Sequence, residues 1–454
     1  MRLIRLALPV YVELLTAVVA VGLIDLLWVS GLGSQAVAAV TVATTTEYLA
    51  LGVILAVQTG TTVLVGRRDG KEPITPVIRT AWLLWAAVSL AVAVPGVLLR
   101  EPLARLFTGD AVTAGLTADF YLISLAGLPV FFAQSLADGI FKGRGDTTTP
   151  MRTALLCNAL VIVLDPLFIY GLDLGVPGAA AATVLARAVT LAVALTLLSR
   201  RAPRDRPARA NRADAVAIVR TGLPMAGDFL ARSLVGMVLV EVVGGFGVVA
   251  LAGYGIGMKI MLAGVMAFYA LRQAAMIQTA RSGDAGPALG YGLAAGLAVA
   301  AVLNALAMPA AGMFTGDPAV AAEATGFLRW MTLYLVPFGG LISIGGVLQA
   351  SGKGSRLLVA TLAGFAAQLP LAYALSAALG LPGVWLAMAA GAALTLALVA
   401  GPGLPGGSAP SAAGPVRSRL SPGAWRGRRG SGPSNAPGRA PRSTRTAAGR
   451  RSGR

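Results

Sequence analysis

The chain has 454 residues, of which 56% are hydrophobic and only 12% are charged. Soluble globular domains carry about 25% charged residues, so a chain this poor in charge cannot cover a water-facing surface and needs lipid as the solvent for much of its length. The net charge of +18 is spread over short segments between apolar runs and the C-terminal end, which argues against nucleic acid as a partner.

Apolar runs of about twenty residues, each long enough to cross a bilayer core of about 30 Å, recur along the chain and predict about twelve transmembrane helices. The predicted spans are 7–29, 36–65, 77–99, 118–140, 153–172, 177–199, 217–244, 247–278, 287–312, 325–349, 356–379 and 382–402. The start of the chain shows no cleavage site for a signal sequence, so we expect the first helix to be retained. The fold class is therefore an all-α integral membrane protein.

Basic residues alternate between the loops, and this alternation predicts the orientation. Loops that face the cytoplasm are enriched in Lys and Arg. The basic segments are Arg2 and Arg5; Arg67, Arg68 and Lys71; Lys142, Arg144 and Arg152; the arginines of 200–212; Arg281; and Lys353 and Arg356. The intervening loops hold only Arg100, Arg105 and Arg329. We therefore predict a multi-pass protein of the cell membrane with both termini in the cytoplasm.

Short motifs recur in the same order in the two halves of the chain. LFTGD at 106–110 returns as MFTGD at 313–317, and LGVPGA at 174–179 returns as LGLPGV at 379–384. Six predicted helices per half is an even number, so both halves enter the membrane in the same sense. We expect the halves to be related by a pseudo-twofold axis along the membrane normal, with a substrate path between them.

These features divide the chain into four predicted regions. They are an N-terminal six-helix lobe at 1–200, a basic cytoplasmic linker at 201–216, a C-terminal six-helix lobe at 217–402 and a tail at 403–454. The tail is rich in Gly, Pro, Ser, Ala and Arg and has no acidic residue, so it cannot bury a core and we expect it to be disordered. Its arginines could hold anionic lipid headgroups, or the tail could be a dispensable extension.

Two sequence stretches carry a family resemblance. Residues 138–150 read DGIFKGRGDTTTP, and residues 158–183 read NALVIVLDPLFIYGLDLGVPGAAAAT. With Leu8–Pro9 and Asp25 in the first helix, they resemble the signature of the multidrug and toxic compound extrusion (MATE) family, nearer to its DNA-damage-inducible branch. The resemblance covers about residues 3–402. It implies alternating access between two lobes, and export of organic cations or amphipathic drugs by antiport against protons or sodium, with no other cofactor.

The resemblance also implies a cation-coupling site. Asp25 matches the proton-coupling aspartate of the family's first helix, and Asp165 and Thr183 match its polar partners. Two carboxylates close together in a low dielectric do not both ionise easily, which suits proton exchange. The structural alternatives are that Asp25 only pairs with another polar group and that Asp165 only caps backbone groups at the end of its helix. Because the chain lacks histidine, Asp, Glu, Lys or water must carry any intramembrane proton.

The match to the family is imperfect at three positions. Asp138 stands where the family usually has asparagine, Lys142 where it has arginine, and Val161 where the DNA-damage-inducible branch often has asparagine. Val161 lies one helical turn before Asp165, so the hydrogen-bond network there must be rewired. We therefore include Asp138 among the cation-coupling candidates, with a purely structural role equally open.

The second half offers a further polar site formed by Glu241, Asp228 and Lys259. The structural alternatives are salt bridges between Glu241 and Lys259 or between Asp228 and Arg232, which are four residues apart and share a helix face. Several adaptable side chains could line a promiscuous apolar cavity or could face lipid and neighbouring helices. These side chains are Met258, Met261, Met266, Phe268 and Tyr269.

Other classes of membrane protein fit less well. A major-facilitator transporter should carry its signature in the second-to-third loop, where VGRRDGKEP at 65–73 lacks the full pattern. A flippase or exporter of lipid-linked or polysaccharide precursors needs a larger cationic cavity. An intramembrane prenyl-transferring enzyme needs an Asp-rich loop motif, which is not seen, so we expect no enzyme activity and no metal site. The expected partners are small amphipathic or cationic substrates and membrane lipids, bound by a monomer.

Overall fold

The computed structural model describes residues 2–201 and 209–401, and every regular element in these residues is helical. The first half contains α1 (Arg2–Leu14), η1 (Leu15–Ala20), α2 (Val21–Val29), η2 (Ser30–Leu32), α3 (Ser34–Arg68), α4 (Thr75–Leu98), α5 (Arg100–Phe107), α6 (Ala111–Gly143), α7 (Thr148–Pro166), η3 (Leu167–Gly171) and α8 (Gly175–Arg200). The second half contains α9 (Arg212–Gly244), α10 (Val248–Ser282), α11 (Ala288–Phe314), α12 (Pro318–Ala350), α13 (Gly354–Leu379) and α14 (Leu381–Ala400).

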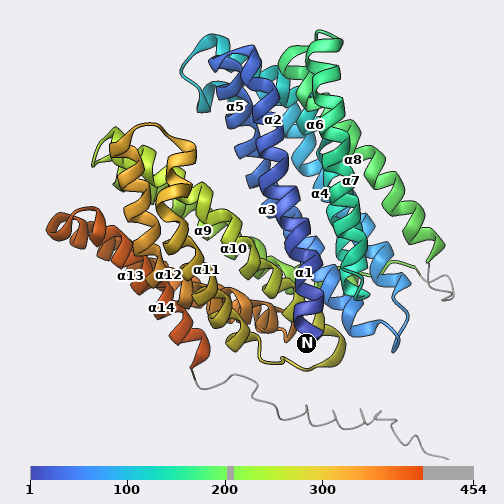
Figure 1. Cartoon of the computed structure of the whole chain (residues 1–454). Helices are drawn as coiled ribbons and strands as arrows, with labels where there is room; N and C mark the ends of the chain where they lie inside the picture. Colours follow the sequence, from blue (N-terminus) through green and yellow to red (C-terminus); the bar gives the residue numbers. More distant parts are fainter. Residues whose placement is uncertain (1, 202–208, 402–454) are drawn as a thin grey trace, which may run out of the picture. The chain divides into compact units, whose positions relative to one another are not determined.

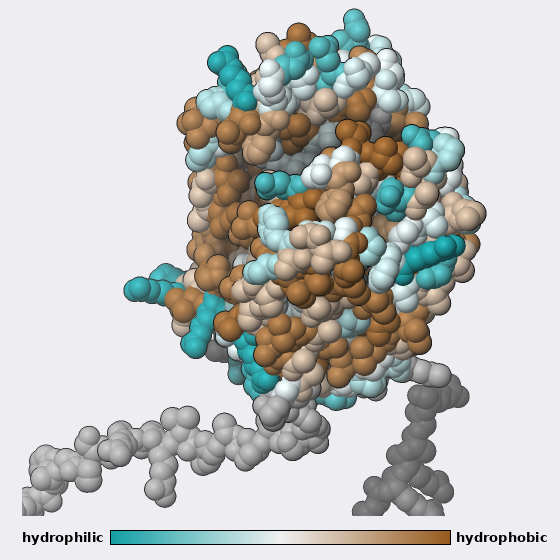
Figure 2. Space-filling model, turned by 90° about the vertical axis from the view of Figure 1, so that its left-hand side faces the viewer, coloured by the Kyte–Doolittle hydropathy of each residue, from teal (hydrophilic) through white to brown (hydrophobic). Residues whose placement is uncertain are grey.

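Each of the predicted spans falls on a helix, which confirms the all-α membrane fold. In the described part of the chain, 11 helices are long and apolar enough to cross a membrane. The remaining predicted span lies on α9, which is 33 residues long but carries Asp214, Arg220, Asp228, Arg232 and Glu241. Figure 2 shows hydrophobic side chains over most of the middle of one face, as expected for a surface in contact with lipid.

Helix α9 begins before the predicted start of the second lobe, and the predicted linker and tail fall partly or wholly outside the described residues. The second lobe was expected to begin at 217, but α9 begins at Arg212 because Asn211 caps it, accepting a hydrogen bond from the Asp214 amide at 2.7 Å. The predicted linker at 201–216 lies partly, and the predicted tail at 403–454 wholly, outside the described residues.

The helix contacts of the two halves repeat one another. Helix α3 packs on α6 as α10 packs on α12, and α6 packs on α8 as α12 packs on α14. Figure 1 shows the halves as two groups of helices, blue to green and yellow to red. The contacts between the halves are reciprocal, since α1 packs on α10 and α3 packs on α9. The first helix of each half thus packs on the second helix of the other, as a pseudo-twofold axis requires.

The repeated FTGD motif has a local structural cause. Asp110 and Asp317 each precede a long helix, α6 and α12, and each caps its first turn. The Asp110 side chain accepts from the Thr113 amide at 2.9 Å, and the Asp317 side chain accepts from the Ala319 amide at 2.8 Å. A capping aspartate satisfies amides that lack an intrahelical partner, so this motif marks the start of the fourth span in each half.

Glycines let the two halves approach backbone to backbone. A Cβ on Gly60 would lie 2.0 Å from the Ile218 carbonyl oxygen, and a Cβ on Gly222 would lie 1.7 Å from that of Ala56. No side chain fits at either place without separating α3 from α9. Small residues at such crossings are the usual means of close helix packing in membranes.

Ion pairs join the halves at one end of this crossing. Arg68 at the end of α3 pairs with Asp214 at the start of α9, and Arg281 in the last turn of α10 pairs with Asp69 at 2.7 Å. Arg281 also donates to the Gly143 carbonyl at 3.2 Å. These residues all lie in or beside the loops predicted to face the cytoplasm.

Candidate functional site

A cavity of about 290 Å³ lies among the helices of the first half. Its wall carries four carboxylates, on Glu13, Asp25, Glu47 and Asp138. Arg187 is the one basic residue on the described wall. Carboxylates buried at membrane depth attract cations and protons, so this cavity is the candidate site.

Asp25 and Asp165 come together as the sequence predicts. Asp25 on α2 is 6% exposed and Asp165 at the end of α7 is fully buried. The charge of Asp165 acts on Asp25, as do the charges of Glu47 and Arg187. Among the described residues, no partner donates to Asp25 Oδ1 or to either oxygen of Asp165. Unpaired buried carboxylate oxygens are costly, so these atoms are suited to take up a proton or a cation.

Irregular helix turns lie next to both of these acids in the chain. The first span passes through the π-helical turn η1, where the Thr16 hydroxyl donates to the Val12 and Glu13 carbonyls at 2.7 and 3.0 Å. Asp165 precedes Pro166, which has no amide proton, and the chain continues as the π-helical turn η3. A π-turn inserts an extra residue and rotates the side chains that follow, and such turns occur frequently at functional sites.

Thr183 and Asn158 complete the polar wall around Asp25. Thr183 lines the cavity from α8, and its buried hydroxyl has no partner in the described chain. Asn158 on α7 donates to the Thr16 carbonyl at 3.0 Å, while its own side-chain oxygen stays unpaired. Sequence reasoning did not select Asn158, although it opens the motif at 158–183.

Glu47 and Arg187 were also missed as site residues, although both were recognisable as intramembrane charges. Arg187 lies over the ring of Phe131, 3.8 Å from its centroid. This cation–π contact holds the guanidinium in the cavity wall, where its charge reaches both Asp25 and Glu47. Glu47 Oε1 is buried without a described partner. Arg187 therefore offsets part of the acidic charge.

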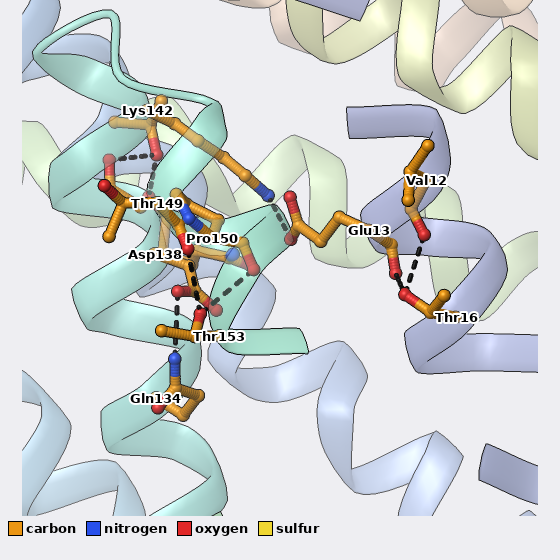
Figure 3. A network of polar contacts seen from close by, with 12 residues as sticks. Val12, Glu13, Thr16, Gln134, Asp138, Lys142, Thr149, Pro150 and Thr153 are labelled. Carbon is orange, nitrogen blue, oxygen red and sulfur yellow. Dashed lines mark hydrogen bonds and ion pairs between the residues drawn. The ribbon is translucent and has the colours of Figure 1, made fainter. Parts of the chain in front are cut away.

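A second acidic cluster lies farther along the same cavity, around Glu13 (Figure 3). The Lys142 ammonium pairs with Glu13 Oε1 at 2.7 Å, and the two residues are only 2% and 8% exposed. Asp138 accepts from Gln134 at 3.0 Å and lies within reach of the charges of Glu13 and Lys142. Lys142 was predicted to be a cytoplasmic loop residue. The placement in a loop is wrong, because α6 continues to Gly143 and the Lys142 side chain reaches Glu13 on α1.

Asp146 stabilises the turn GDTTTP between α6 and α7. Its carboxylate accepts from the Thr149 amide at 2.9 Å and pairs with Arg201 at 2.6 Å. Burial alone would raise the pKa of Asp146, but the Thr149 hydrogen bonds and the Arg201 charge outweigh it and hold this pKa below its usual range. The preceding Gly145 has φ +81°, which lets the chain reverse.

In the second half, Asp228 is the centre of a different cluster. It accepts from Arg232 at 3.1 and 3.3 Å, from Arg272 at 3.1 Å and from Thr361 at 2.9 Å. The predicted Asp228–Arg232 salt bridge is therefore present. Glu241 and Lys259 are exposed and form no ion pair with each other, so the structure does not bring them to Asp228.

A cavity of about 220 Å³ lies beside this cluster. Of the side chains proposed to line such a cavity, Met258, Met261 and Tyr269 do so. Met266 and Phe268 are buried at 4% and 0% exposure and are absent from its wall. Neighbouring positions on one helix point in different directions, which explains the division.

Comparisons with known proteins agree on one family. The MatE family model matches residues 9–167 and 224–374. The probable multidrug resistance protein YpnP of Bacillus subtilis is 25% identical over 238 residues, covering 51% of this chain and 54% of that protein. The multidrug export protein MepA of Staphylococcus aureus is 23% identical over 314 residues, covering 66% and 69%. With the first of these relatives, the chain matches about half of the partner's length.

Solved structures show the same fold over nearly the whole described chain. The MATE transporter VcmN of Vibrio cholerae in the bent form has a TM-score of 0.79 at 21% identity, covering 87% of this chain and 94% of that one. A MATE structure in complex with MaL6 has a TM-score of 0.80 at 24% identity. These likenesses establish the two-lobe architecture.

Proposed function

Because the chain belongs to the MatE family of transporters, we propose that it exports organic cations or amphipathic drugs by antiport against protons, with Asp25 as the main coupling carboxylate. The observation that carries this proposal is the acidic cavity of the first half, which Asp25 lines, together with the buried Asp165 whose charge acts on Asp25. Asp25 Oδ1 and both oxygens of Asp165 have no described partner. Sodium is the alternative coupling ion.

The charge of this cavity favours a cationic cargo. The wall carries four carboxylates and one basic residue, Arg187, and Lys142 reaches Glu13 from beside the cavity. The acids outnumber the bases, so the cavity carries a net negative charge when its carboxylates are ionised. A low-dielectric site of this kind attracts an organic cation strongly and repels an anion. The flippase alternative would need the opposite polarity here.

The proposed cycle exchanges a proton for the drug at Asp25. With Asp25 and Asp165 ionised, the cavity holds the cation. Protonation removes that charge, releases the drug to the outside and lets the halves rearrange about their reciprocal helix contacts. One charge moving down about 100 mV releases about 2.3 kcal/mol, and each unit of pH gradient adds about 1.4 kcal/mol.

The experiment is efflux of a fluorescent organic cation in vesicles with an imposed pH gradient. Asp25→Asn keeps the size of the side chain but cannot ionise, so we expect it to abolish gradient-driven transport at unchanged membrane abundance. Lys259→Gln, at an exposed position away from the cavity, is the control. Transport by Asp25→Asn at the wild-type rate would overturn the proposal, and dependence on sodium without protons would change the coupling ion.

We further propose that the protein acts as a monomer in the cell membrane, with membrane lipids around it and both termini in the cytoplasm. The ends of α3 and α10 that carry Arg68 and Arg281, and the adjoining Asp69, are then cytoplasmic. The ion pairs between them would hold the halves together on that side.

A further inference from the structure

The cavity of the second half differs in charge from the cavity of the first. No acidic residue lines its described wall, and Arg232 is the one formally charged residue there. The nearby carboxylate of Asp228 is shared between Arg232 and Arg272, so the cluster has one carboxylate for two guanidinium groups. Two positive charges against one negative charge leave this site with a formal excess of one positive charge.

Several contacts fix the guanidinium group of Arg232, and part of it keeps N–H donors that no described residue uses. Its Nε and Nη2 atoms donate to Asp228, and Nη2 also contacts Thr361 at 3.4 Å. Its guanidinium lies 5.4 Å from the ring centroid of Phe338 and 5.7 Å from that of Phe365. No described residue bonds to Nη1. A guanidinium fixed in this way needs little reordering to bind a carboxylate.

The rest of the wall suits an aromatic ring. Tyr334 stacks on Phe338 with centroids 4.7 Å apart, so these rings present a flat surface beside Arg232. Met258, Met261 and Met388 add polarisable side chains that adapt to the outline of a ligand. The hydroxyl groups of the tyrosines at 254, 269 and 334 make no hydrogen bond to another described residue, so they remain available as donors.

From this combination we propose that the second-half cavity is a binding site for a small aromatic monoanion, with Arg232 as its anion-binding residue and the aromatic and methionine side chains holding the ring. The site is separate from the cation-coupling cavity, and it goes beyond the proposed drug–proton exchange. It gives the transporter two cavities of opposite polarity, one in each half.

The test compares two probes of nearly the same shape, one anionic and one uncharged. Binding of 2-naphthoate and of uncharged 2-naphthamide to the purified full-length protein is measured by equilibrium dialysis. We expect naphthoate to bind about tenfold or more tightly than naphthamide, because a charge-assisted hydrogen bond in a buried site is worth about 1.5–3 kcal/mol. Equal binding of the two probes, or no binding of naphthoate, would overturn the proposal.

Variants then locate the site. Arg232→Gln should weaken naphthoate binding by about tenfold or more and leave naphthamide binding nearly unchanged. Arg220→Gln removes an exposed arginine from the same helix and should change neither. Tyr334→Phe keeps the ring and removes one donor, so it should weaken naphthoate binding more than naphthamide binding. Wild-type naphthoate affinity in a folded Arg232→Gln protein would refute the assignment; if that variant does not fold, wild-type affinity in Tyr334→Phe would do so.

A parallel measurement separates this proposal from the proposed function. The cationic analogue 2-naphthylmethylammonium reports on the acidic cavity, and its binding should fall in Asp25→Asn. Unchanged binding of the ammonium probe in Asp25→Asn would count against the cation-coupling site alone. If the naphthoate measurements do not give the expected differences, this would count against the second-half site alone.

Discussion

The buried pair of Glu13 and Lys142 offers the sharpest test of how the first half is held together. The two residues are 129 positions apart in the chain, yet their charged groups lie 2.7 Å apart and both are almost fully buried. Lys142→Met fills a similar volume but leaves Glu13 and the nearby Asp138 without their cation. We expect this change to destabilise the protein strongly.

The magnitude follows from the burial of both partners. Removing one member of a buried ion pair costs about 3–5 kcal/mol, because the other charge is left unpaired away from water. At the usual unfolding entropy per residue, this corresponds to a fall in Tm of about 3–5 °C for a chain of this size. Glu13→Gln alone should have a smaller effect, because Asp138 remains nearby to pair with Lys142. The double variant should recover most of the stability lost by Lys142→Met.

The assay is thermal unfolding of the purified variants in detergent, analysed as a double-mutant cycle. Lys259→Met and Glu241→Gln make the same chemical changes at exposed positions and serve as matched controls. A coupling free energy of about 1 kcal/mol or more is expected for groups in direct contact. If the losses in the two single variants simply add in the double variant, the ion pair does not stabilise the fold and the reasoning fails.

Four further predictions concern other parts of the chain. Gly222→Val should prevent the close approach of α3 and α9 and lower Tm and membrane abundance, whereas Gly236→Val, where a Cβ meets open space, should not. The pKa of Asp146 is lowered in the folded protein, so its ionised carboxylate stabilises the fold above the unfolded pKa of about 3.9. This stabilisation is lost as the pH falls through the folded pKa. Asp146→Asn should therefore remove part of the acid-induced drop in Tm measured below about pH 4. Truncation after Pro402 should leave efflux unchanged at equal membrane abundance, and loss of transport would show that the tail is needed. An alkaline-phosphatase fusion at the C-terminus should be inactive, and an active fusion would contradict a cytoplasmic C-terminus.

Much of the fold was accessible from the sequence because membrane helices satisfy strong local constraints. A span must be long, apolar and helical, so the runs at 36–65 or 325–349 could be located without tertiary information. The repeated FTGD motif indicated the two halves, and its cause is a local capping bond that each copy makes within its own helix. The motif at 138–183 identified the family for the same reason, since it is contiguous in the chain. The roles of Asp25, Asp165, Thr183 and Asp138 in coupling stay predictions.

The tertiary structure alone decided which charged groups meet. Sequence spacing could pair Asp228 with Arg232, four residues away, but not with Arg272 on the next helix, and the excess positive charge of that site depends on this third member. Lys142 was assigned to a loop because its neighbours are basic, although α6 continues past it and turns it inward to Glu13. The rotation of each helix, and the register shift that a π-turn introduces, depend on packing between residues distant in the chain. Those long-range contacts gave one half an acidic cavity and the other a basic one.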